Sequence, residues 1–133
     1  MVTTSAAFPA SKMDAITAQS ESGNRHSANG QIITSPKGAM GRMQVMPGTA
    51  ADPGFGVRPA RDKSDGELTR VGREYRSAME RRYGGDPAKM WAAYNWGPGN
   101  LDKALQEYGN DWLRYAPQET QNYIRKNIAA LRG

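Results

Sequence analysis

The sequence predicts a mainly α-helical protein built as a single domain. With 133 residues, the chain has room for one domain and is long enough to bury a core. Leu, Ile, Val and Phe together number only 16, whereas Ala numbers 18 and Met 7, a composition that suits small residues at helix crossings and methionine in irregular gaps. Apolar residues recur at helical spacing in several segments. We therefore expect a thinly cored bundle of helices.

The first elements follow from local stop and turn signals. Residues 1–11 are small, polar and punctuated by proline, which predicts a flexible lead-in outside a domain of residues 12–133. A helix from Lys12 to the region of Glu21 is expected to stop at Gly23. The Asn-Gly pair within "NGQIIT" then predicts a short β-hairpin arm around residues 28–35.

The remaining elements are mainly helices separated by turn formers. The segment "GRMQVMPGTA" allows a short helix, and the proline- and glycine-rich stretch after it predicts a long connector. Asp86 followed by proline indicates a helix start, which "GPG" must stop, and Asn100 is expected to cap the next helix. The expected connector and further helices are Ala51–Gly66, then Glu67–Tyr83, a helix through Met90 and Tyr94, one through Leu101 and Leu105, and Pro117–Leu131.

The charge balance does not decide between partners. The formal net charge is +5, which favours polyanionic surroundings such as nucleic acid or an anionic cell wall, or reflects only a soluble surface. Acidic residues are interleaved with the arginines between Glu67 and Arg82, a pattern typical of a solvated helix face. No apolar run reaches the length of a membrane span or a signal-peptide core. We expect neither a membrane span nor export by the general secretory route.

The inventory of reactive side chains excludes several chemistries. Cysteine is absent and His26 is the single histidine, so neither a zinc site nor a Cys-His nucleophile can be assembled. A Ser-His-Asp triad would have to rest on His26 in a polar loop. An enzyme with this sequence is therefore expected to use carboxylates.

Glu21 in "AITAQSESGN" has two interpretations. Surface helices commonly carry solvated glutamates, and Gly23 behind it is an ordinary helix stop. A carboxylate near a helix C-terminus nevertheless gains nothing from the macrodipole, which is mild evidence for a functional role.

Four motifs, in order, resemble the catalytic domain of the soluble-type lytic transglycosylases, which are lysozyme-like. They are "ESG" at 21–23, "SPKGAMGRMQVMPGTA" at 35–50, "AAYNWGPGN" at 92–100 and "ETQNYIRK" at 119–126. The resemblance implies a helical lysozyme-like domain with a groove for peptidoglycan glycan strands and no cofactor or metal. It also implies cleavage of the β-1,4 bond between N-acetylmuramic acid and N-acetylglucosamine, with attack by the muramyl 6-hydroxyl to give a 1,6-anhydro sugar.

The resemblance assigns Glu21 as the single acid and base. Retaining and inverting glycosidases need a second carboxylate, for which only Asp52 and Asp62 stand nearby, but the substrate's 2-acetamido group can replace it. Glu119 is expected to be an inward-facing structural carboxylate, and it is the main rival as a second catalyst. Substrate-binding residues carried over from the family are Ser35, Met43, Gln44, Met46, Tyr94 and Asn95, with Glu119 and Tyr123 in support. Ser35 alone also fits a plain turn serine, and the methionines fit core residues.

Three departures from the family pattern stand out. The loop between Gly23 and Ser35 is longer than the shortest members need, and Arg42 occupies a position that is usually small or apolar. Trp96 stands where alanine is usual, and it could equally stack on a sugar or fill the core.

The strings "GQIITSPKG" and "ADPGFGVRPARD" look most like transglycosylase domains of bacteriophage virion proteins. This predicts local wall opening in the periplasm by a virion-associated protein, as part of a larger virion protein, without a need for nucleic acid. Two alternatives stay open: a lysozyme-type hydrolase on the same fold, and a non-catalytic glycan- or nucleic-acid-binding module.

Overall fold

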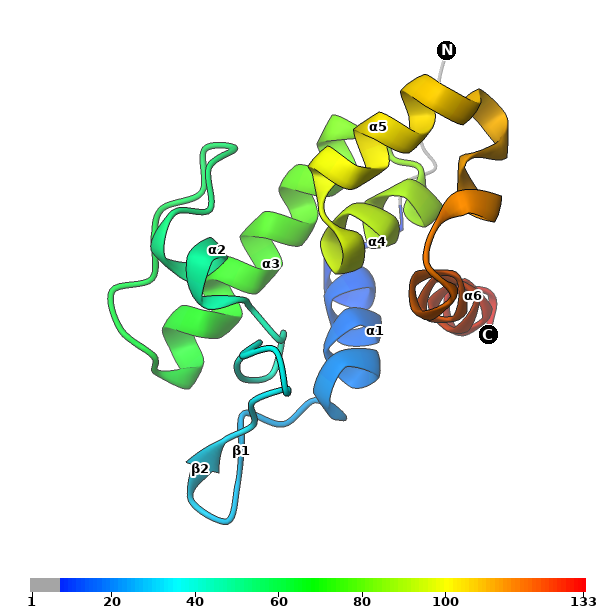
Figure 1. Cartoon of the computed structure of the whole chain (residues 1–133). Coiled ribbons are helices and arrows are strands. Elements are labelled where there is room, and N and C mark those ends of the chain that lie inside the picture. The colour runs from blue at the N-terminus through cyan, green and yellow to red at the C-terminus, as the bar shows by residue number, and fades with distance from the viewer. Residues whose placement is uncertain (1–7) are drawn as a thin grey trace. The chain divides into compact units, whose positions relative to one another are not determined.

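The computed structural model describes residues 8–133 and confirms a mainly helical fold with one small hairpin (Figure 1). The chain divides into two compact units, the first ending at Ala78 and the second beginning at Met79. The elements of the first unit are α1 (Ala10–Ser22), β1 (Ser27–Ala28), β2 (Gln31–Ile32) and α2 (Pro47–Ala51), and α3 (Asp65–Arg82) crosses the division. The second unit contains α4 (Pro87–Trp96), α5 (Pro98–Tyr108), the 3-10 helix η1 (Gly109–Tyr115) and α6 (Gln118–Arg132).

Helix α1 begins earlier than its sequence pattern predicted. The expected lead-in of residues 1–11 lies partly outside the described residues, but Ala10 and Ser11 already belong to α1. The reason is Pro9, whose ring fixes φ at −56° and whose carbonyl accepts hydrogen bonds from the amides of Lys12 and Met13 at 3.0 and 3.1 Å. The predicted stop is confirmed, because Gly23 has the left-handed conformation with φ of 69°.

The predicted hairpin is confirmed, at residues 27–32. Ser27 pairs with Ile32 and Ala28 with Gln31 in antiparallel register. Asn29 and Gly30 form the two-residue turn with φ of 54° and 77°, the positive values that the favoured hairpin turn requires. Figure 1 shows this hairpin as an arm that projects beyond the end of α1.

The long connector between α2 and α3 is held in place by hydrogen bonds of charged side chains. Glu67 is buried, and its carboxylate accepts hydrogen bonds from the backbone amide of Arg61 at 3.0 Å and from Nε of Arg70 at 3.1 Å. Arg70 also donates to the carbonyls of Arg58 and Pro59. The expected connector is therefore a loop of defined conformation. Buried apolar side chains of the first unit include Met13, Ala18, Met40, Met43, Val45, Leu68 and Val71.

The second unit begins with the predicted cap. The side chain of Asp86 accepts a hydrogen bond from the Lys89 amide at 3.2 Å, ahead of Pro87 at the first helical position. The expected cap at Asn100 is wrong. Helix α5 starts at Pro98, directly after Gly97, so Asn100 lies inside it and its amide donates to the Trp96 carbonyl at 2.7 Å.

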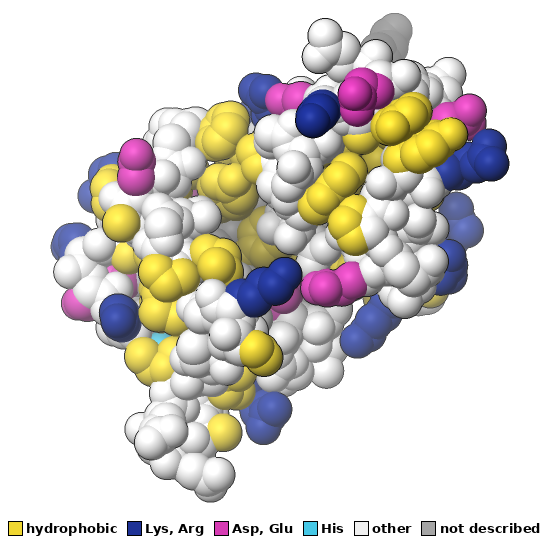
Figure 2. Space-filling view, in the orientation of Figure 1, with side chains coloured by type: hydrophobic (Ala, Val, Ile, Leu, Met, Phe, Trp, Pro, Cys, Tyr) yellow, Lys and Arg dark blue, Asp and Glu magenta, His cyan; other side chains and the backbone are white. Residues whose placement is uncertain are grey.

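Helix η1 is an element that the sequence did not predict. Its residues lack helical periodicity, and it continues directly from α5. Tyr108 and Tyr115 stack with ring centroids 3.7 Å apart and are both exposed. Hydrophobic side chains are visible over α5 and η1 in Figure 2.

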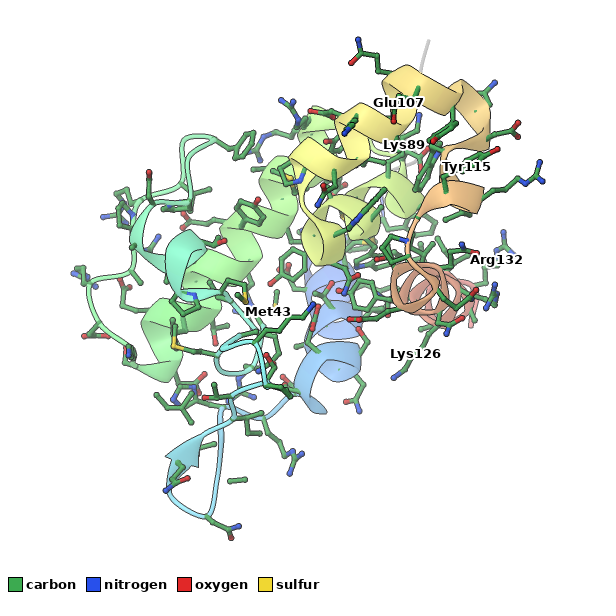
Figure 3. All side chains as sticks on the ribbon, viewed as in Figure 1. Met43, Lys89, Glu107, Tyr115, Lys126 and Arg132 are labelled. Carbon is green, nitrogen blue, oxygen red and sulfur yellow. The ribbon has the colours of Figure 1, made fainter. Side chains whose placement is uncertain are left out.

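Helix α6 confirms the last predicted helix to within a residue. Helix α4 packs against both α5 and α6. Lys126 and Arg132 are exposed and point away from α6 (Figure 3). Buried side chains of this unit include Met90, Trp91, Leu101, Trp112, Ile124 and Leu131. Within residues 8–133 no helix combines the length and apolar character needed to cross a bilayer.

Candidate active site

Glu21 stands in the last turn of α1 and is half-buried. The helix closes immediately behind it: the amides of Gly23 and Asn24 donate to the carbonyls of Gln19 and Ala18 at 2.9 and 3.0 Å. Asn24 itself has φ of 61°, a left-handed conformation that few residues other than glycine adopt. The carboxylate is thus carried by a helix end whose backbone is fixed by two consecutive left-handed residues.

The loop of residues 41–46 is attached to this helix end. The Ser22 hydroxyl donates to the backbone carbonyl of Arg42 at 2.7 Å and accepts a hydrogen bond from the Arg25 amide at 3.0 Å. The Arg42 side chain donates through Nη1 to the Asn24 carbonyl and to its Oδ1, the latter at 3.1 Å. Arg42 therefore contacts the chain on the C-terminal side of Glu21 twice.

The same guanidinium is anchored on α3. Nε and Nη2 of Arg42 donate to the two carboxylate oxygens of Asp65 at 3.1 and 2.7 Å, in a forked arrangement. The hydrogen bond from Arg42 is the main cause that lowers the pKa of Asp65 from 3.8 to about 2, and the Thr69 hydroxyl, 2.9 Å from Oδ1, adds to it. Asp65 therefore stays ionised at neutral pH.

Four carboxylates in the described part of the first unit, including Asp65, form ion pairs with arginine. Asp14 binds Arg76, Glu74 binds Arg70, and hydrogen bonds from Arg70 and Arg61 hold the pKa of Glu67 well below its usual range. Of the two nearby candidates for a second catalyst, Asp62 is exposed and its pKa is lowered by hydrogen bonds from Ser64. Asp52 is also exposed, at the C-terminal end of α2. Glu21 differs from both candidates because its side chain is half-buried.

The side chains of Ser35 and Gln44 form hydrogen bonds with the backbone of residues 33–41. The Ser35 hydroxyl accepts from the Ala39 amide at 3.0 Å, while its own amide donates to the Ala39 carbonyl at 2.8 Å. Gln44 has φ of 50°, and its side-chain amide donates to the carbonyls of Ile33 and Gly41. Ser35 is thus a turn serine, as the alternative interpretation had it, although its hydroxyl proton is not used by the bond from Ala39.

The two methionines expected in the groove differ in exposure. Met43, labelled in Figure 3, is 1% exposed, so the expectation that it lines a groove is wrong. A side chain with so little accessible surface is a core residue. Met46 is 42% exposed and stays a candidate for contact with substrate.

The expected site residues of the second unit lie on α4 and α6. Tyr94 and Asn95 occupy the last turn of α4, and both are half-buried. Oδ1 of Asn95 accepts a hydrogen bond from the buried hydroxyl of Thr120 at 2.8 Å, which fixes the end of α4 on α6. Tyr123 is half-buried one turn further along α6.

Glu119 corrects another expectation. It is exposed in the first turn of α6, where an acid complements the helix dipole, and not inward-facing. Trp96 is half-buried, which is compatible with either of its two interpretations. Within residues 8–133 no group of three or more His, Asp or Glu side chains is arranged to hold a metal ion.

The matched family decides the identity of the domain. Residues 9–114 match the Transglycosylase SLT domain. The chain belongs to this family. The SLT domain match includes Glu21, Arg42 and Tyr94, and it ends before α6.

Two solved structures are similar to this SLT domain. One is the 70 kDa soluble lytic transglycosylase from Escherichia coli, with a TM-score of 0.69 and 26% identity over 92% of this chain and 21% of that one. The other is the lytic transglycosylase Slt from Pseudomonas aeruginosa as an inactive Glu-to-Gln mutant, with a TM-score of 0.67 and 27% identity over 90% and 20% of the two chains. The chain therefore spans about a fifth of the length of each enzyme.

Sequence reasoning missed three residues around the helix end of this SLT domain. They are Ser22, Asn24 and Asp65, which join Arg42 in one hydrogen-bonded group. The one available signal was Arg42 itself, which the sequence analysis marked as a departure from the family pattern.

Proposed function

We propose that this SLT domain is a peptidoglycan lytic transglycosylase, with residues 12–133 acting as one catalytic domain. The observation that carries the proposal is a half-buried glutamate at the end of α1 in a domain of this family. It is supported by the likeness to two lytic transglycosylases, one of them inactive as a Glu-to-Gln mutant. The substrate would be the β-1,4 bond between N-acetylmuramic acid and N-acetylglucosamine.

Glu21 would act first as acid and then as base. Its carboxyl gives a proton to the glycosidic oxygen as the bond from that oxygen to C1 of the muramyl residue breaks, and the 2-acetamido oxygen stabilises the cation at C1. The Glu21 carboxylate then takes the proton of the muramyl 6-hydroxyl while that oxygen bonds to C1. The products are a free 4-hydroxyl and a 1,6-anhydro sugar, and Glu21 returns protonated.

Arginine side chains bind four carboxylates of the first unit, which supports a mechanism with a single catalytic carboxylate. An Arg-bound carboxylate such as Asp65 stays ionised at neutral pH and cannot donate a proton. The proposed substrate-binding residues remain Ser35, Gln44, Met46, Tyr94 and Asn95, with Tyr123 in support. Glu119 has no proposed catalytic role because it is exposed.

Mass spectrometry of the soluble products from purified peptidoglycan tests the proposal, with Glu21→Gln beside the natural protein. Products ending in 1,6-anhydromuramic acid, lost in the variant, are expected. Reducing-end products, heavier by one water, would instead make the domain a lysozyme-type hydrolase. A folded protein that yields neither product, yet binds glycan equally well with Glu21→Gln, would be a binding module.

The place of action is proposed to be the periplasmic cell wall, after delivery with a bacteriophage particle. The support is the similarity of "GQIITSPKG" and "ADPGFGVRPARD" to virion transglycosylase domains. Immunoblotting of purified virions for this chain is the direct test, and a chain detected only in uninfected cells would contradict it.

A further inference from the structure

The end of the helix that carries Glu21 is held by side-chain hydrogen bonds among four residues, in addition to the backbone hydrogen bonds of the helix. We define the Arg42 clamp as Arg42 with Ser22, Asn24 and Asp65. Ser22 directly follows Glu21, and Asn24 comes two residues later, so the clamp contacts the chain on both sides of Gly23. All four residues belong to the first unit.

The last residues of a helix need such support. The final carbonyls of a helix have no partners within the ladder, and helix ends fray. Here the backbone beyond Glu21 leaves the helix through two left-handed residues, of which Asn24, with φ of 61°, is the one that carries a side chain. Nη1 of Arg42 donates to both the carbonyl and the side-chain oxygen of this residue, which stabilises its conformation.

The clamp also has a fixed base. Asp65 is the first residue of α3, and its two oxygens accept from Nε and Nη2 of Arg42 at 3.1 and 2.7 Å. Oδ1 of Asp65 additionally accepts from the Thr69 hydroxyl, one turn further along α3. The planar guanidinium thus presents separate edges to α3 and to the end of α1, a geometry that lysine cannot reproduce.

We propose that Arg42 is a positioning residue for Glu21, which fixes the end of α1 against α3 through Asn24, Ser22 and Asp65. This inference rests on the proposed function, because it gives Glu21 the catalytic role. Arg42 itself transfers no proton. Misplacement of a catalytic group by about 1 Å can cost about 100-fold in rate, so a loosened helix end should be visible in kcat.

The test compares Arg42→Leu and Arg42→Lys with Arg82→Leu as matched control. Arg82 also forms a partly exposed ion pair, with Asp102, and both residues belong to the second unit. Arg42→Leu is expected to lower kcat by about 10- to 100-fold with KM changed less than about twofold, Arg42→Lys to be intermediate, and Arg82→Leu to match the natural protein. Asp65→Asn, which keeps the side-chain size, is the second variant if Arg42→Leu fails to fold.

Amide hydrogen exchange separates this inference from the proposed function. Exchange at Gly23 and Asn24 is expected to be faster in Arg42→Leu than in the natural protein and unchanged in Arg82→Leu. The positioning role would be overturned if Arg42→Leu left both the exchange rates and kcat unchanged, or if it raised KM alone. It would also be overturned if Arg82→Leu lowered kcat as much as Arg42→Leu does. A natural protein without cleavage activity would overturn the proposed function, while the exchange rates would still decide whether Arg42 fixes the helix end.

Discussion

Arg76 on α3 and Asp14 on α1 form a buried ion pair, with Nε 2.5 Å from Oδ1. The Arg76 side chain is 1% exposed and that of Asp14 16%. Because the loss of an ion-pair partner is costly for a buried charge, Asp14→Ala is expected to lower the free energy of unfolding by about 3 kcal/mol. Arg76→Met should cost less, since it removes the more deeply buried charge. Urea unfolding of the two variants measures their unfolding free energies. Equal losses of unfolding free energy would contradict the argument that the buried Arg76 charge is what makes Asp14→Ala costly.

The Arg42–Asp65 pair predicts a defined loss of stability in acid. The pKa of Asp65 in the folded protein is lowered from 3.8 to about 2, so its contribution is present above pH 4 and is lost as the pH falls toward 2. The effect should be small, because the Asp65 side chain is 45% exposed and water screens the pair. Asp65→Asn is expected to flatten the fall of unfolding free energy between pH 4 and pH 2. An unchanged slope would mean that the pair contributes nothing measurable.

Gly23 and Gly84 provide a matched pair of left-handed positions, with φ of 69° and 66°. A Cβ at Gly23 would meet Nε of Arg25 at 3.6 Å, an ordinary contact, and one at Gly84 would meet nothing within 4 Å. Each substitution to alanine should therefore cost about 1 kcal/mol through backbone strain alone. Only Gly23→Ala is expected to reduce cleavage, because Gly23 lies two residues after Glu21. Thermal unfolding together with product release measures both, and equal cleavage by the two variants would count against the importance of this helix end.

The elements of this fold were predictable wherever a local signal decides them. Gly23, Asn29-Gly30 and Asp86 act on backbone groups within a few residues, and the helices and the hairpin that depend on them lie within a few residues of where the sequence indicates. Helix η1 has no such signal, because it only continues the chain from α5.

The candidate site was harder to predict because its contacts are distant in sequence. Arg42 and Asp65 are 23 residues apart, and no local pattern pairs them. Met43 and Glu119 were misjudged for the same reason. Whether a side chain is 1% exposed or open to solvent depends on how several elements pack, which a motif does not record.

The hydrogen bond between Asn95 and Thr120 offers a test of the second unit. Thr120 is 2% exposed, so Asn95→Ala would leave a buried hydroxyl without this acceptor and should cost about 2 kcal/mol of unfolding free energy. Thr120→Val removes the donor as well and should cost less. A double-mutant cycle with Asn95→Ala and Thr120→Val is expected to give a coupling of about 1 kcal/mol, measured by urea unfolding. Additive losses of unfolding free energy would show that the hydrogen bond does not fix α4 on α6. Some other contact would then have to hold Tyr94, beside Asn95, in its proposed substrate-binding position.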